Sequence, residues 1–310
     1  MTVRILVTGA NGDIAEAIGR ILKTSFPQAA VDGADSQGTF PGSLLFQSVH
    51  ALPAARAPDF LDSFRSLASH YDRVIPVPEA ELLALARQDD AWRAAVPLVM
   101  NAPWVISTFC DKLETARWLD QHGGFSARTA RLQDIGVGDL PVVAKPRAGW
   151  GSRGVEIVRT PERLAAVRAE ATGDWIAQEL LDDPQAEYTC AIARDGAVTN
   201  TITMRRTMQG GLTKQATIVE DPAIDRMLRS IADSLPDRAF INVQLRVFRG
   251  EPRIFEINPR FSSTVMMRHL AGFEDVLWIL NALDGQPMPP AKARPGATII
   301  RMSREIVVDE

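Results

Sequence analysis

The chain has 310 residues, with 34 Lys and Arg against 38 Asp and Glu, and a formal net charge of −4 at pH 7. At roughly 150 residues per domain this length predicts about two domains, and the acidic balance excludes the basic footprint of a nucleic-acid-binding domain. Two cysteines, Cys110 and Cys190, are too few for a disulfide framework or a cysteine-rich zinc site. No signal-peptide or membrane-span pattern is present, so we expect a cytoplasmic protein without membrane or nucleic-acid partners.

The first hundred residues alternate between strand-like and helix-like segments, as in a small open parallel sheet with helices on its faces. An apolar strand over Arg4–Thr8 leads through a tight Gly9–Gly12 turn into a helix over Ile14–Leu22, where apolar residues recur at helical spacing. The pattern further predicts a loop over Asp32–Ser43, helices over Ala57–His70 and Glu79–Arg87, and a buried strand over Arg73–Val77.

The Gly9–Gly12 turn stands where a dinucleotide-binding fingerprint would stand, but it matches that fingerprint only in part. Backbone N–H groups reach a pyrophosphate there when glycines allow a close approach, and the third glycine position holds Ala15. Neither tyrosine, Tyr71 or Tyr188, is followed four residues later by the lysine of a short-chain reductase. A NAD(P)-dependent Rossmann reductase is therefore the weakest alternative.

A second part of the chain begins after Pro103. Ser107 is the expected N-cap of a helix that runs through Lys112 towards the Gly123-Gly124 stop. From Ile176 onward, longer alternating strands predict an antiparallel sheet. The remaining expected strands are Pro141–Lys145, Val155–Arg159, Ile176–Leu181, Tyr188–Arg194, Val198–Arg205, Ala239–Phe248, Arg253–Ile257 and Ala297–Met302, and the remaining expected helices are Pro161–Ala171, Ala223–Leu235 and a closing segment over Val265–Leu283.

A lysine at the end of a buried strand precedes a glycine-rich loop, which is a layout typical of phosphate binding. The strand ends at Lys145, and Gly149-Trp150-Gly151-Ser152-Arg153-Gly154 follows almost at once. The lysine supplies a point charge, and glycines let backbone N–H groups approach anionic oxygens. Taken alone, Lys145 could be a strand-end surface lysine and the loop a plain hairpin. Lys112, on the preceding helix, adds a second cation.

Two further features of the sequence suit a nucleoside. The segment Ala177–Leu181 offers an extended backbone edge that can hydrogen-bond an adenine, and the carboxylate of Glu187 suits the paired hydroxyls of a ribose. This signal is weak by itself, because acidic residues near strand ends are usually solvated.

The sharpest feature is a set of oxygen ligands on two neighbouring strands. Glu256 and Asn258 are two residues apart and so project from one face of a strand, and Gln244 can lie across from them. Oxygen-only ligands fit a hard cation, Mg²⁺ or Mn²⁺, shared with nucleotide phosphates. Arg260, just beyond, can hold a transferring phosphoryl group by a forked contact. A lone Glu-x-Asn would be better explained as the polar face of an ordinary strand.

Four features follow one another along the chain: Lys112, Lys145 with its glycine-rich loop, the Ala177–Leu181 segment with Glu187, and the oxygen ligands with Arg260. In this order they resemble the ATP-grasp superfamily, and most closely its carbamoyl-phosphate-synthase-like branch of carboxylate-amine ligases. The resemblance covers nearly the whole chain. It implies an α/β fold in which a Rossmann-like pre-ATP-grasp domain (residues 1–104) precedes a two-lobed ATP-grasp domain. That domain would have a small lid lobe (105–178) and a larger lobe with an antiparallel sheet and the metal site (179–310).

The resemblance also implies roles for individual residues. It implies nucleotide contacts by Lys112, Lys145, Gly149, Gly151, Ser152, Gly154, Glu179, Leu181 and Glu187, metal contacts by Gln244, Glu256 and Asn258, and catalytic roles for Lys145 and Arg260. Further candidates for phosphate or substrate contact are Arg205, Arg206, Lys214, Ser262 and His269.

The predicted activity is an ATP- and Mg²⁺ (or Mn²⁺)-dependent ligation of a carboxylate to an amine or similar nucleophile, through an acylphosphate. Catalysis would come from positioning and charge stabilisation rather than from a nucleophilic side chain. A non-catalytic ATP-binding or regulatory protein of the same fold is the second alternative. The expected partners are small-molecule carboxylates and amines, and a homodimer is left open.

Overall fold

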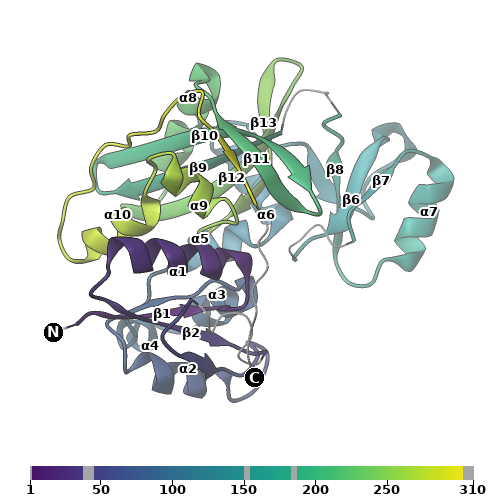
Figure 1. The fold of residues 1–310 in the computed structure, drawn as a ribbon. Helices are drawn as coiled ribbons and strands as arrows, with labels where there is room; N and C mark the ends of the chain where they lie inside the picture. The colour runs from purple at the N-terminus through teal and green to yellow at the C-terminus, as the bar shows by residue number, and fades with distance from the viewer. Residues whose placement is uncertain (1, 38–44, 150–153, 183–186, 303–310) are drawn as a thin grey trace.

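The computed structural model describes residues 2–37, 45–149, 154–182 and 187–302. These residues form a four-stranded, a six-stranded and a second four-stranded sheet, called here the first, the large and the small sheet. Figure 1 shows the first sheet with its helices at the bottom, the large sheet above them and the small sheet standing out to the right. This mixed α/β arrangement confirms the predicted fold class. None of the helices in the described ranges is long and apolar enough to cross a membrane.

The first sheet has the order β3-β2-β1-β4, and its neighbouring strands are all parallel, as predicted. Its strands are β1 (Arg4–Thr8), β2 (Ala30–Asp35), β3 (Val49–Ala51) and β4 (Arg73–Ile75), and its helices are α1 (Asp13–Ser25), α2 (Phe60–Ala68), α3 (Glu79–Ala86) and α4 (Asp90–Ala94).

The loop expected over Asp32–Ser43 was wrong at its start, because β2 continues to Asp35. Asp32 is buried in this strand, where its carboxylate accepts hydrogen bonds from the Tyr71 hydroxyl at 2.8 Å and the Ser48 N–H at 3.0 Å. These tertiary partners outweigh the low strand propensity of an Asp-Gly-Ala-Asp segment. Of the expected loop, residues 38–43 lie outside the described residues.

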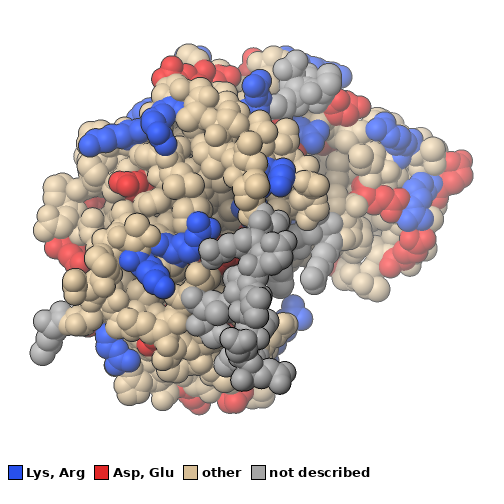
Figure 2. Space-filling view, in the orientation of Figure 1, with Lys and Arg blue, Asp and Glu red and all other residues tan. Residues whose placement is uncertain are grey.

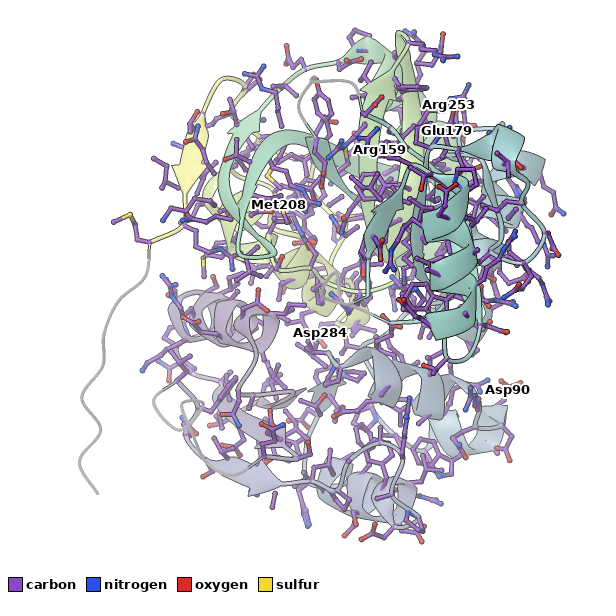
Figure 3. The ribbon with its side chains drawn as sticks, turned by 90° about the vertical axis from the view of Figure 1, so that its right-hand side faces the viewer. Asp90, Arg159, Glu179, Met208, Arg253 and Asp284 are labelled. Atoms are coloured by element: carbon purple, nitrogen blue, oxygen red, sulfur yellow. The ribbon has the colours of Figure 1, made fainter. Side chains whose placement is uncertain are left out.

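Helix α1 packs on the first sheet and also against the helices α9 (Val265–Leu270) and α10 (Asp275–Leu283) that cover the large sheet. One apolar cluster contains fully buried α1 residues such as Ile18 together with residues of α9 and α10. Asp284, labelled in Figure 3, lies at this boundary and pairs with Arg73 of β4. The first sheet is therefore held against the rest of the chain by a shared core, in which each buried aliphatic side chain contributes about 1.5–3 kcal/mol.

The small sheet is antiparallel, with the order β5-β8-β6-β7. Its elements are β5 (Thr129–Arg131), the short 3₁₀ turn η2 (Val137–Asp139), β6 (Val142–Pro146), β7 (Glu156–Val158), α7 (Pro161–Glu170) and β8 (Trp175–Glu179). Strand β8, which we expected in the large sheet, lies here instead, between β5 and β6. Figure 2 shows acidic and basic side chains interspersed on this protruding part, where Arg163 pairs with Glu156 and Glu170.

The large sheet has the order β13-β12-β9-β10-β11-β14 and is antiparallel throughout, as predicted. Its elements are β9 (Glu187–Asp195), β10 (Val198–Gln209), β11 (Leu212–Ile218), α8 (Pro222–Asp233), β12 (Arg238–Phe248), β13 (Glu251–Asn258) and β14 (Thr298–Ile300). Strand β11 follows a turn at Gly210 and Gly211, both with positive φ, and it was not among the expected strands.

Helices α5 (Pro103–Phe109) and α6 (Lys112–Gln121) replace the single helix expected from Ser107. The N-cap predicted at Ser107 was wrong, because Ser107 lies inside α5. Asp111 caps α6 instead, by accepting hydrogen bonds from two backbone N–H groups of its first turn at 3.0 and 3.1 Å. Side chains of both helices share an apolar cluster with β12 and α8 of the large sheet. The domain limits at residues 104 and 178 remain a prediction.

The closing segment forms two helices because Gly272 interrupts it. Gly272 has a φ of +91°, and a Cβ there would lie 2.4 Å from the carbonyl oxygen of Lys292. Only glycine tolerates both the left-handed backbone and this close approach. Gly285, at the end of α10, has a similar φ of +76°, but a Cβ there would meet none of the described atoms within 4 Å.

These two glycines give a matched pair for unfolding measurements. Gly285→Ala should lower the free energy of unfolding by about 1 kcal/mol, the cost of a left-handed alanine. Gly272→Ala should lower it by at least about 3 kcal/mol, because the backbone contact with Lys292 must also open. Urea denaturation followed by circular dichroism measures both, and equal losses would show that the close approach contributes nothing.

Candidate active site

Lys145 lies near the end of β6, with its ammonium group buried between the small and the large sheet. The residue is 5% exposed, and Nζ donates to Oε1 of Gln178 at 2.7 Å and to the carbonyl oxygen of Phe255 at 3.3 Å. Burial lowers the pKa of Lys145 to about 8, against the opposing effect of the Glu256 carboxylate. Because both acceptors are neutral, the lysine is suited to binding an anion.

A β-bulge makes the Phe255 carbonyl available. Gln244 of β12 pairs with Glu256, whereas the next residue, Leu245, pairs with Ile254, so Phe255 has no partner in the ladder. Its carbonyl oxygen accepts from Lys145 and also from Nε2 of Gln178 at 3.3 Å. The small sheet is thereby joined to the strand that carries the predicted metal ligands.

The structure brings Gln244, Glu256 and Asn258 together. Gln244 faces Glu256 across the strand pair, and Nδ2 of Asn258 donates to Oε1 of Glu256 at 2.9 Å. The donor set, one carboxylate and two amide oxygens, fits the oxygen coordination that Mg²⁺ and Mn²⁺ prefer. In the described ranges, no group of three or more His, Cys, Asp or Glu side chains could hold a metal ion.

Lys112, the first residue of α6, contacts the start of the glycine-rich loop. Its Nζ donates to the carbonyl oxygen of Gly149 at 2.7 Å. Arg147 anchors the start of α6 to the same connection, because its Nε contacts both carboxylate oxygens of Asp111 at 2.8 Å. Gly149 has a φ of +127° and Gly154 a φ of +69°, as a glycine loop requires. The other two predicted loop contacts, Gly151 and Ser152, lie outside the described residues.

The residues predicted to bind the nucleoside lie where the small sheet passes into the large one. Figure 3 labels Glu179, at the end of β8, on this side of the molecule. The carbonyl oxygen of Leu181 accepts from Nη1 of Arg246 at 2.7 Å. Glu187 is held by two arginines, with Oε1 accepting from Nε of Arg206 at 3.0 Å and Oε2 from Nη2 of Arg246 at 3.0 Å.

Two basic candidates lie elsewhere. Arg205 projects from the opposite face of β10 and is exposed, because side chains alternate along a strand. Its neighbour Arg206 takes the inward position and donates to Oε1 of Gln244 at 2.8 Å. Nζ of Lys214 donates to the carbonyl oxygen of Arg301 at 3.0 Å, so its ammonium group is bound to the C-terminal segment.

Of the other two candidates, Ser262 is hydrogen-bonded in the protein interior and His269 is half-buried. Ser262 is 5% exposed, and its Oγ accepts from Nη1 of Arg268 at 2.8 Å. Arg268 in turn forms a fully buried ion pair with Asp275 at 2.6 Å. Nδ1 of His269 is buried without a hydrogen-bond partner among the described residues, and burial lowers its pKa. Ser262 thus holds the segment that follows Arg260.

Glu79 is a site residue that the sequence analysis assigned only to a helix start. Its carboxylate lies within electrostatic reach of Arg260, Lys112 and Glu256. Burial raises the pKa of Glu79, and the two cations oppose that shift. A cleft of about 340 Å³, lined by Glu79, Arg260 and the Gly9–Gly12 turn, adjoins these groups. No local sequence pattern points to Glu79, because its neighbours come from distant parts of the chain.

The Gly9–Gly12 turn forms one wall of this cleft, and the nearby carboxylate of Asp35 already accepts backbone hydrogen bonds. Asp35, at the position where a dinucleotide-binding domain holds a ribose, accepts hydrogen bonds from the N–H groups of Asn11 at 3.0 Å and Gln37 at 2.9 Å. A Cβ at Gly9 would lie 2.8 Å from the Pro78 ring. The glycine is therefore explained by packing of the turn against the β4–α3 connection.

Comparisons with known proteins agree with this arrangement. Residues 171–305 match the family model described as "ATP-grasp in the biosynthetic pathway with Ter operon". The solved structure of an L-amino acid ligase from Bacillus licheniformis superposes with a TM-score of 0.74 at 18% identity, over 96% of this chain and 78% of that one. An N5-carboxyaminoimidazole synthetase from Staphylococcus aureus, complexed with ADP, gives a TM-score of 0.77 at 12% identity, over 97% and 83%.

The chain has the ATP-grasp fold. This result confirms the predicted resemblance to the ATP-grasp superfamily. Among curated sequences, the chain is 30% identical over 112 residues to the "Uncharacterized protein MG011 homolog" of Mycoplasma pneumoniae, a match that spans 36% of this chain and 38% of that relative. The match therefore covers well under half of the relative's length.

The lowered pKa of Lys145 predicts how nucleotide binding depends on pH. A protonated lysine favours anionic phosphates, so the affinity for ADP with Mg²⁺ should fall as the pH rises through about 8, approaching about tenfold per pH unit. Lys145→Met should bind ADP more weakly at pH 7 and lose this pH dependence. Calorimetric titrations from pH 7 to 9.5 on both proteins measure the effect, and parallel pH profiles would contradict the assignment of Lys145.

Proposed function

We propose that this chain is an ATP-dependent ligase that joins a carboxylate to an amine through an acylphosphate, with release of ADP and phosphate. The observation that carries the proposal is the contact of Lys145 with the Phe255 carbonyl. This contact joins a buried cation of the small sheet to β13, the strand that carries the proposed ligands Glu256 and Asn258. A nucleotide triphosphate bound between them would meet both.

The proposed triphosphate contacts follow from this geometry. Lys145 lies near the end of β6, where it contacts Gln178 of β8. Lys112 lies at the N-terminus of α6, where it contacts the carbonyl oxygen of Gly149, which follows β6. The side chains of Gln244, Glu256 and Asn258 would hold Mg²⁺ or Mn²⁺, which when bound neutralises charge on the terminal phosphates. Glu179, Leu181 and Glu187 are the proposed adenine and ribose contacts.

The proposed reaction has two steps. The substrate carboxylate attacks the γ-phosphorus, the bond to the bridging oxygen breaks, and ADP leaves. The amine nitrogen then attacks the acyl carbon and loses a proton, a C–N bond forms, and the C–O bond to phosphate breaks. Arg260, which lines the cleft, would hold the transferred phosphoryl group by its guanidinium.

The resemblance to an L-amino acid ligase makes amino acids the first substrates to test. We expect the wild-type protein to form a hydroxamate from at least one of the common L-amino acids when ATP, Mg²⁺ and hydroxylamine are present, because hydroxylamine traps an acylphosphate. ADP release should rise in parallel.

Glu256→Ala should lower this rate by at least about a hundredfold, because a charged ligand at the phosphates is lost. Glu251→Ala is the matched control, since Glu251 is an exposed carboxylate at the start of the same strand, and its activity should equal that of the wild type. ATP binding without turnover, across a broad panel of carboxylates, would favour the non-catalytic alternative.

A further inference from the structure

Glu79 connects the phosphate-binding side of the site with the cleft. It is the first residue of α3, directly after β4, and it lies at the carboxyl edge of the parallel first sheet. The turn after β1 reaches the same edge, because β1 and β4 are parallel neighbours. This edge is where open α/β sheets present their ligand-binding loops.

The other carboxylates of the cleft already have partners. Asp35 accepts two backbone N–H groups of the turn region, and Asp13 forms an ion pair with Arg301 at 3.3 Å. Glu79 has Arg260 and Lys112 as electrostatic neighbours, but among the described residues no Lys or Arg nitrogen lies within the 4 Å of an ion pair with its carboxylate. Its charge is thus available to a ligand in the cleft.

The cleft carries charges of both signs. A carboxylate that attacks the γ-phosphorus must lie near Lys112, Lys145 and Arg260, where cations offset the negative charge of both reactants. The nucleophile then attacks a face of the acyl carbonyl, and it must reach that carbon through space that the phosphates do not fill. Glu79 lines the cleft together with Arg260 and adds a negative charge there, which suits a cation and disfavours another carboxylate.

We propose that Glu79 binds the ammonium group of the second substrate, an aliphatic primary amine, in the cleft between the Gly9–Gly12 turn and Arg260. This proposal rests on the proposed ligase function and names the class of its nucleophile. Glu79 is then a specificity-determining residue, which orients the nitrogen before it attacks the acylphosphate.

Hydroxylamine separates this role from the activation step. It is largely uncharged at neutral pH and therefore needs no carboxylate to bind it, whereas an amino acid used as the nucleophile carries an ammonium group. The test compares hydroxamate formation with amide formation for each common L-amino acid as nucleophile, using the acyl donor that the wild type activates best.

Glu79→Gln should raise the KM for the amine by at least about tenfold, since a charged hydrogen bond is lost. It should leave hydroxamate formation and the KM for ATP within about threefold of the wild type, and Glu79→Asp should recover part of the amine affinity. Glu81→Gln is the matched control: Glu81 is buried on the same helix and interacts with Thr8. It should leave both reactions unchanged.

Equal losses of hydroxamate and amide formation in Glu79→Gln would overturn the proposal and assign Glu79 to the phosphate site. An unchanged KM for the amine would overturn it as well. Failure of the underlying function looks different, because the wild-type protein would then form no hydroxamate from any carboxylate.

Discussion

The carbonyl oxygen of Phe255 accepts hydrogen bonds from Lys145 and Gln178, two side chains of a different sheet. This is possible because a bulge in the β12–β13 pair leaves Phe255 without a ladder partner. The bulge therefore does two things: it frees an acceptor that fixes the small sheet against the large one, and it sets Glu256 beside the buried lysine. If the ladder continued without a bulge, this carbonyl would pair within the large sheet and Lys145 would lose a neutral acceptor in an otherwise buried place.

Charge is distributed so that the site suits an anion. Burying a lysine disfavours its charged form, as the lowered pKa of Lys145 shows, and an anionic ligand would offset that cost. Lys112 and Arg260 add positive charge, and the Glu256 carboxylate favours the charged form of Lys145. The buried Arg268–Asp275 ion pair and Ser262 hold the segment that follows Arg260. We infer that this packing orients the guanidinium of Arg260.

Local patterns predicted the elements whose residues repeat with a clear period, such as β1, α8 and most strands of the large sheet, but they missed β11. They also placed Lys145 at a strand end and Glu256 and Asn258 on one face of one strand. What they missed depends on distant contacts: β2 became a strand because Tyr71 and Ser48 satisfy Asp32, and Asp111 rather than Ser107 caps α6. Neither the bulge at Phe255 nor the arrival of Glu79 from the first sheet leaves a local signature, since each is defined by its partners. Strand alternation also decides between Arg205 and Arg206, but only once the register is known.

The most direct measurement is a crystal structure with Mn²⁺ and a non-hydrolysable ATP analogue, in which anomalous scattering locates the metal. The account predicts manganese bound by side-chain oxygens of Gln244, Glu256 and Asn258, with the terminal phosphates in contact with Nζ of Lys145. A nucleotide bound instead at the Gly9–Gly12 turn, with no metal on β13, would contradict it.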